Sequence, residues 1–168
     1  MNIKKTILAM TVLAMMTAAG VTGAQGAADP QTTSGWFANR IVGAYASHAM
    51  VRVCGSPGPD FPVVNTIIFN QGGTVVAAPR FPPQGADGYS RTIDLGTWSY
   101  NPRTNRYSVS LHFYGFVNGE FQGTTHVERT LQMSADGNSV SGPVHTTTYA
   151  PDGSVILEQC GTATSTRQ

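Results

Sequence analysis

The sequence predicts an all-β protein, folded as an eight-stranded antiparallel up-and-down barrel that one disulfide closes. β-branched and aromatic runs recur about every dozen residues, with turn residues between them. Two cysteines stand near opposite ends of this region, and the only helix-period stretch within it is about one turn near Trp36 to Arg40. Together these observations favour a closed meander of consecutive hairpins.

The N-terminus resembles a bacterial secretory signal. Two lysines are followed by an apolar run over residues 6–21 and then by small residues. We expect cleavage before Ala27, with cuts before Gln25 or Asp29 as alternatives. A retained membrane anchor is disfavoured because no basic flank follows the apolar run.

Removal of residues 1–26 would leave residues 27–168 as a single β-barrel domain, located in the periplasm or secreted. Both lysines leave with the signal, and eight arginines then face nine acidic residues. Such a balance offers no basic surface, so we expect no binding to nucleic acid and none to a membrane after cleavage. The sequence leaves the oligomeric state open.

Cys54 and Cys160 are the two cysteines, roughly a hundred residues apart. Export would place them in an oxidising compartment, where an even pair is most simply a disulfide. A redox-active pair is disfavoured because the spacing is not Cys-x-x-Cys. On the chain-entropy model the bond stabilises the fold by about 4 to 5 kcal/mol.

The strands are predicted where β-branched and aromatic residues concentrate. In chain order they are Ile41–Val53, Val63–Phe69, Thr74–Ala78, Thr92–Tyr100, Arg106–Phe116, Phe121–Met133, Val140–Tyr149 and Val155–Thr162. The turns between them carry Gly or Asn wherever a positive φ is needed, which favours hairpins over crossovers. They are residues 70–73, 101–105, 118–119, 135–138 and 151–153.

Two longer connections, Gly55–Pro62 and Arg80–Ser90, are rich in Pro and Gly. In a strict meander they follow the first and third strands, so both lie at the same end of the barrel. They are either rigid plugs or the rim of a mouth that admits a ligand.

The turns also predict which side chains share a face. A three-residue loop at 118–120 pairs Val117 with Phe121, and a four-residue loop at 135–138 brings Met133 beside Val140. The inward face is then largely apolar. Its members are Val109, Leu111, Phe113, Val127, Leu131, Met133, Val140 and Val144.

On the opposite face the same register groups three histidines with one glutamate. Imidazole and carboxylate are ligands of zinc and non-haem metal sites and can act as acid and base. They alternate with Ser and Thr, as solvent-facing residues do, so the preferred interpretation is a solvated surface and no metal is assigned. The four residues are His112, His126, Glu128 and His145.

Arg129 falls on the inward face, where a guanidinium needs a partner. It either pairs with a buried acid, such as Asp94 or Glu158, or reaches an aqueous lumen and holds an anionic group. The aromatic residues expected to supply most of the buried area are Tyr45, Trp98, Tyr107, Phe113 and Phe121. If these rings line a cavity instead, Arg129 is the polar group that would bind a ligand there.

The run Ile41–Tyr45, the later Gly96-Thr97-Trp98 and the eight-strand meander resemble the calycin group of secreted barrels, of the lipocalin and avidin type. The stretch Gly96–Gly161 is also similar to exported bacterial barrels, some of them like the allene oxide cyclase barrel. This resemblance implies a lumen that can hold an apolar molecule.

The preferred function is therefore an exported barrel that binds a small, largely apolar ligand in its lumen, without a cofactor. The expected ligand-binding residues are Trp98, Tyr107, Leu111, Phe113, Val127, Arg129, Leu131 and Val144. One alternative is a cyclase or isomerase in which Arg129 or Tyr107 stabilises developing charge. Another is an inhibitor of a secreted hydrolase. No Gly-x-Ser-x-Gly, phosphate-loop or His-Glu-x-x-His motif occurs.

Overall fold

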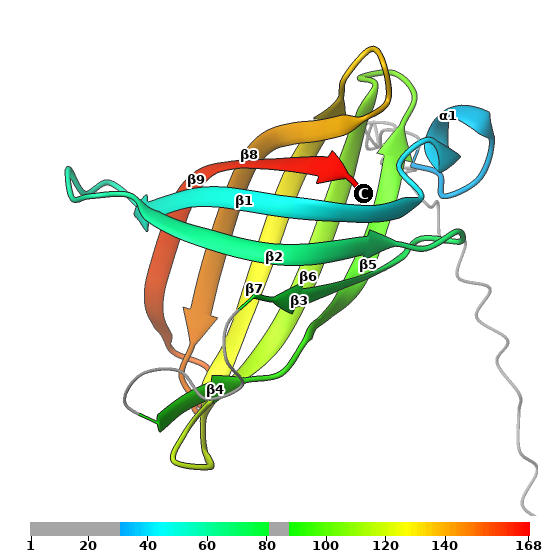
Figure 1. Cartoon of the computed structure of the whole chain (residues 1–168). Coiled ribbons are helices and arrows are strands. Elements are labelled where there is room, and N and C mark those ends of the chain that lie inside the picture. Colours follow the sequence, from blue (N-terminus) through cyan, green and yellow to red (C-terminus); the bar gives the residue numbers. More distant parts are fainter. Residues whose placement is uncertain (1–30, 81–87) are drawn as a thin grey trace, which may run out of the picture.

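The computed structural model describes residues 31–80 and 88–168, and the expected signal peptide lies outside these residues (Figure 1). The elements are one short helix and nine strands in this order: α1 Trp36–Asn39, β1 Gly43–Val53, β2 Phe61–Phe69, β3 Thr74–Pro79, β4 Tyr89–Arg91, β5 Asp94–Asn101, β6 Arg106–Val117, β7 Glu120–Met133, β8 Ser139–Tyr149 and β9 Val155–Arg167. The predicted helical turn is confirmed as α1.

The strands form a closed antiparallel barrel. Each of β1, β2, β3, β5, β6, β7, β8 and β9 pairs with its neighbours, and β9 returns to pair with β1 from Tyr45↔Arg167 to Val53↔Gln159. The short strand β4 precedes β5 along the same edge of β6, so the two occupy one position in an eight-stranded barrel. The predicted fold class is confirmed.

The β6–β7 register follows the prediction along most of its length. Leu111 faces Val127 and His112 faces His126, as expected. At the tip the turn contains two residues, so Val117 pairs with Glu120 and not with Phe121. A β-bulge next to Gly115 restores the predicted register, because one extra residue on one strand shifts the pairing by one.

Because of this bulge, the prediction that Phe121 is buried in the core is wrong. Phe121 pairs with Phe116 on the outer face and keeps 44% of its surface exposed. Its ring lies among Tyr114 and Phe116, with centroids 6.1 and 5.9 Å away. Tyr45, Trp98 and Tyr107 are buried as predicted.

Glycine permits the close approach of neighbouring strands. A Cβ added at Gly161 would overlap the carbonyl oxygen of Met50 on β1, and one added at Gly96 would overlap that of Ser110 on β6. A Cβ added at Gly142 on β8 would likewise overlap the carbonyl oxygen of Thr130 on β7. Strands that must bend to close a small barrel commonly carry glycine at such points.

The half of the lumen next to α1, here called the packed half, is filled with side chains. The tyrosine hydroxyl of Tyr107 donates a hydrogen bond of 2.6 Å to the carbonyl oxygen of Phe37 in α1. The Tyr107 ring contacts Tyr100 and Trp98, with centroids 5.0 and 6.2 Å away. Its largest fully buried residues include Tyr45, Ile41, Ile67, Phe69, Val75, Leu111, Leu131 and Val140.

The opposite end, here called the mouth, is where the chain leaves β1 and β3 and where β6–β7 and β8–β9 turn (Figure 1). The antiparallel order therefore puts both predicted long connections at this end, although residues 81–87 of the second lie outside the described residues. The predicted disulfide is also confirmed here. Cys54, just after β1, is bonded to Cys160 of β9, with their Cα atoms 5.1 Å apart.

Candidate functional site

A cavity of about 100 Å³ occupies the lumen between the packed half and the mouth. Its apolar lining residues are Ala49, Val51, Val63, Phe113, Val127 and Val144. Its polar lining residues are Asn65, Arg91, Asp94, Thr125, Arg129, Thr146 and Gln159. Strand alternation explains this set, because the contributing residues of β1, β7 and β8 are spaced by two and point inward. Thr125 and Gln159 keep partial exposure, so the cavity reaches solvent at the mouth.

The structure divides the predicted ligand-binding residues into two groups. Four of them line this cavity: Phe113, Val127, Arg129 and Val144. The other four lie in the packed half: Trp98, Tyr107, Leu111 and Leu131. The indole N–H of Trp98 donates to the carbonyl oxygen of Asn70 at 2.9 Å, which fixes that ring as part of the core.

Arg129 points into the lumen, as the register predicts, and is 5% exposed. Its Nη1 donates a hydrogen bond of 3.1 Å to Ser47 Oγ on β1. Glu158, one of the two expected partners, faces outward instead, with its Oε1 3.9 Å from Nε2 of His145. Asp94, the other, lies within the same lumen as Arg129.

Asp94 is paired most closely with Arg91, a residue for which the sequence pattern predicts no role in the lumen. Asp94 Oδ1 lies 3.1 Å from Arg91 Nη2, and the Arg91 guanidinium carbon lies 3.9 Å from the centroid of the Phe113 ring. Neither atom of the Arg91–Asp94 contact has hydrogen-bond geometry with any described residue. The contact is therefore an ion pair without an aligned hydrogen bond.

The three charged groups share one low-dielectric region. Burial raises the pKa of Asp94 from 3.8 to about 6, although Arg91 and Arg129 act in the opposite direction. Burial likewise lowers the pKa of Arg129, and the nearby Asp94 partly offsets this. At neutral pH the cluster thus holds two guanidinium groups against one carboxylate.

Several buried polar atoms around the cavity lack a hydrogen-bond partner within residues 31–80 and 88–168. They are Arg91 Nε and Nη2, Arg129 Nε, Asp94 Oδ1 and Asn65 Oδ1. Such atoms are rare in folded proteins and call for water, an ion or a ligand. Their concentration around one cavity distinguishes it from the rest of the lumen.

Asp94→Asn tests the protonation of this cluster. Between about pH 4 and pH 6 the folded protein holds a proton on Asp94 that the unfolded chain has released. The stability that Asp94 contributes is thus present below its unfolded pKa and is lost as the pH rises through its folded pKa. The quantity to follow is the difference in unfolding free energy between the unsubstituted protein and D94N. We expect this difference to fall by on the order of 3 kcal/mol from about pH 4 to pH 7. Urea titrations across this range measure the difference, and parallel pH profiles would contradict it.

The histidines and the glutamate lie on the outer face, with the predicted pairings His112↔His126 and Glu128↔His145. The rings of His112 and His126 have centroids 6.2 Å apart. Within the described part of the chain, three potential metal-ligand residues have their ligand atoms within 4.8 Å of one another, namely Cys54, His145 and Cys160. Because the two sulfur atoms are bonded to each other, they are not available as thiolate ligands.

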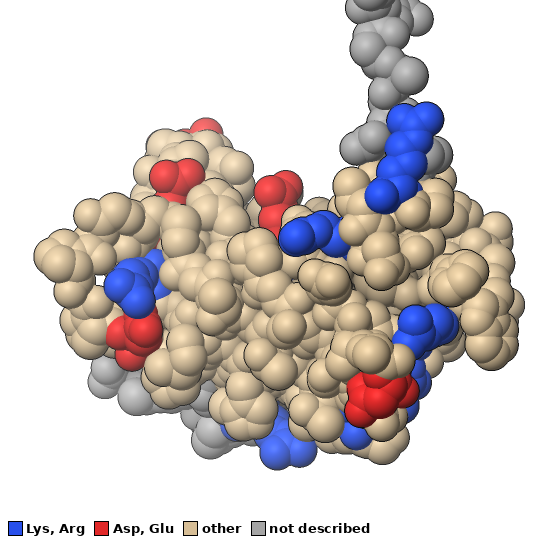
Figure 2. Space-filling view, turned by 90° about the horizontal axis from the view of Figure 1, so that it is seen from above, with Lys and Arg blue, Asp and Glu red and all other residues tan. Residues whose placement is uncertain are grey.

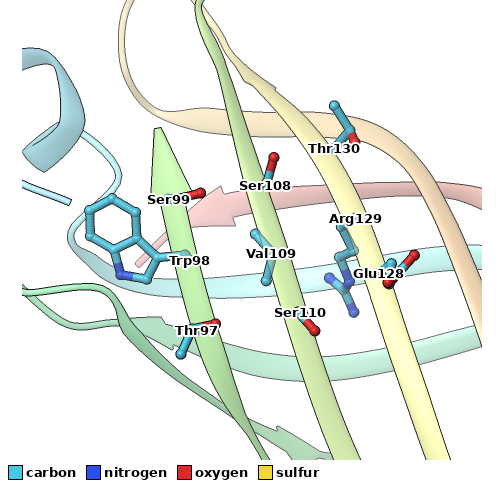
Figure 3. A pocket seen from close by; sticks show the side chains of 9 residues that line it. All are labelled: Thr97, Trp98, Ser99, Ser108, Val109, Ser110, Glu128, Arg129 and Thr130. Carbon is cyan, nitrogen blue, oxygen red and sulfur yellow. The ribbon is translucent and has the colours of Figure 1, made fainter. Parts of the chain in front are cut away.

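A second, shallower hollow lies over β5, β6 and β7 (Figure 3). Its side chains on the outer face are the hydroxyls of Thr97, Ser99, Ser108, Ser110 and Thr130 and the carboxylate of Glu128. Solvent can hydrate all of these groups, so the hollow offers a ligand little burial. The lumen cavity is the better candidate site.

Charged side chains are sparse on the surface that Figure 2 shows, and basic and acidic groups are interspersed there. The exposed pair Arg52 and Asp60 is one example, with Arg52 Nε 2.7 Å from Asp60 Oδ1. Within the described residues, no helix combines the length and the apolar character that a membrane crossing requires.

No protein-family model matches the chain, and no curated protein matches it. Among solved structures, the chain is similar to the crystal structure of Rv2717c from M. tuberculosis, with 12% sequence identity and a TM-score of 0.38. The alignment covers 77% of this chain and 93% of that chain. The barrel architecture is thus established by the strand pairing itself, whereas membership of the calycin group stays a prediction.

Proposed function

We propose that the protein is an exported barrel that binds a small ligand in the cavity of its lumen. The observation that carries the proposal is the lumen cavity of about 100 Å³, with valines and Phe113 on its wall and unpartnered polar atoms beside them. An apolar wall with a few convergent polar groups is the usual composition of a small-molecule site. The disulfide and the signal-like N-terminus support export.

The cavity restricts the size of the ligand. Pockets for drug-sized ligands measure roughly 300 to 1,000 Å³, whereas an apolar cavity of about 150 Å³ holds benzene. A volume of about 100 Å³ therefore suits a molecule with only a few non-hydrogen atoms. The packed half offers no comparable space, because Leu111 and Leu131 are each 1% exposed and fill it.

The alternative of an isomerase or cyclase finds less support in the lumen. Tyr107, one of its two expected charge-stabilising residues, donates a hydrogen bond to the carbonyl oxygen of Phe37 and lies in the packed half. Burial raises the pKa of Tyr107 to about 12, which keeps this hydroxyl protonated. Arg129 is the remaining candidate, and it serves a binding protein equally well. The inhibitor alternative has no specific observation in its favour.

Native mass spectrometry of protein purified from its own host tests the proposal. We expect a copurified small molecule, or uptake of at least one member of a probe series of butyrate, butyramide and butan-1-ol. Turnover of the copurified molecule would favour an enzyme, and a copurified protein would favour an inhibitor.

Ala49→Leu, which projects into the cavity from β1, should weaken the binding of any such molecule by about tenfold or more because it fills the available space. Ala46→Leu on the outward side of the same strand is the matched control, and it should leave binding unchanged. Equal effects of the two substitutions would contradict a site in the lumen.

A further inference from the structure

Resting on the proposed function, we propose that the group which the barrel recognises is a carboxylate, held in the lumen between the guanidinium groups of Arg129 and Arg91. The rest of the ligand would be a short hydrocarbon body against the apolar wall. The lumen then acts as a site for short-chain carboxylic acids.

The first support is the set of unused hydrogen-bond donors. Arg129 Nε and Arg91 Nε are buried and have no hydrogen-bond acceptor among the described residues, and both side chains line the cavity. Arg91 Nη2 lies 3.1 Å from Asp94 Oδ1 but makes no aligned hydrogen bond with it. Arg129 uses Nη1 to reach Ser47, which fixes the guanidinium in place without occupying Nε. A guanidinium presents its donors in a rigid plane that fits the two oxygens of a carboxylate.

The second support is the balance of charge. The cluster contains Arg129, Arg91 and Asp94, and the other polar lining residues, Asn65, Thr125, Thr146 and Gln159, are neutral. Asp94 is 2% exposed and contacts Arg91 without an aligned hydrogen bond. One carboxylate thus faces two cations, and a second carboxylate would neutralise the remaining charge among side chains that are themselves buried. A cationic ligand would instead meet net positive charge.

The third support is the shape of the lining. Arg91 stacks on the Phe113 ring at 3.9 Å, which directs its guanidinium along the side of the cavity. Val51, Val127 and Val144 form an apolar wall beside these polar groups. A neutral apolar ligand would fill that wall but leave the arginine donors unpaired, which a buried site strongly disfavours. The arrangement therefore suits a molecule with one acidic end and a short apolar end.

Asp94 gives this site a characteristic pH dependence. The charged or titratable groups that interact with Asp94 are Arg91 and Arg129 in the lumen, His112 on β6 and Tyr89 on β4. As Asp94 gains a proton below about pH 6, its competition for the arginines ends. Carboxylic acids titrate near pH 4 to 5 and stay ionised above that range. We therefore expect butyrate affinity to rise as the pH falls from about 7.5 to 5.5, and to stay nearly constant in D94N.

Calorimetric titration at low ionic strength separates this inference from the proposed function. The probes are acetate, propionate, butyrate and hexanoate, together with butyramide and butan-1-ol as neutral matches. We expect one of the acids to bind at least about tenfold more tightly than the neutral compounds, the effect of a charge-assisted hydrogen bond. Equal binding of butyrate and butyramide would overturn the carboxylate inference and leave the lumen site intact. Binding of none of the probes would overturn both.

Arg129→Gln should weaken butyrate binding by about 10- to 100-fold while leaving butyramide binding nearly unchanged. Glutamine can still donate to Ser47, and circular dichroism verifies that the variant is folded. Arg91→Gln, at a side chain that is 13% exposed, provides a second variant with the same expected loss. Arg106→Gln, exposed at the far end of β6, carries the same charge change and should have no effect. A loss in R106Q equal to that in R129Q would contradict recognition within the lumen.

Discussion

Replacing Cys54 and Cys160 together by alanine is expected to lower the free energy of unfolding by about 4 to 5 kcal/mol. The bond joins residues 106 positions apart and ties the end of β1 to β9 at the seam where the barrel closes. Without it, the unfolded chain gains the conformational freedom of a loop that spans most of the domain.

Urea unfolding of the double variant measures this change, and reduction of the unsubstituted protein by dithiothreitol should reproduce it. Only the two end strands lose a covalent link, so the far-ultraviolet circular dichroism of the folded state should stay that of a β protein. A loss below about 1 kcal/mol would contradict the role of the disulfide in closing the barrel.

Trp98→Ala is the second substitution with a large expected effect, a loss of about 3 to 5 kcal/mol. Trp98 is 2% exposed, packs against Tyr107 and donates its indole N–H to Asn70. Removing the indole leaves a void in the packed half, and the carbonyl oxygen of Asn70 loses its donor.

Phe121→Ala is the matched control, because the sequence pattern predicts that Phe121 and Trp98 are buried alike. Since Phe121 is 44% exposed on the outer face, we expect its replacement to cost less than about 1 kcal/mol. Thermal and urea unfolding of the two variants provide the comparison. Equal losses would contradict the β-bulge that turns Phe121 outward.

Most of the barrel could be predicted from alternation and turn chemistry. Period-two burial along β6 and β7 placed Leu111 and Val127 inside and His112 and His126 outside, and the pairing agrees. The hairpin tip could not be predicted in the same way. Asn118 and Gly119 both adopt positive φ and close a two-residue turn, and the bulge then compensates for the shorter loop.

The candidate site was predicted only in part, and Arg91 shows why. Alternation back from Trp98 places Asp94 inside, and a continuous strand would then turn Arg91 outward. The interruption between β4 and β5 shifts the pairing by one residue, so that Arg91 faces Gly115 while Leu95 faces His112. Arg91 therefore points inward. A local break of this kind leaves no periodic trace in the sequence, whereas Arg129 lies on an unbroken part of β7 and was found.

A crystal structure of the protein grown with butyrate below pH 6 tests the central claim most directly. We expect the butyrate carboxylate between Arg91 and Arg129, with its hydrocarbon chain against Val127 and Val144. The claim would be contradicted if both guanidinium groups were hydrogen-bonded to Asp94 and the lumen held no butyrate. It would also be contradicted if butyrate bound only outside the barrel.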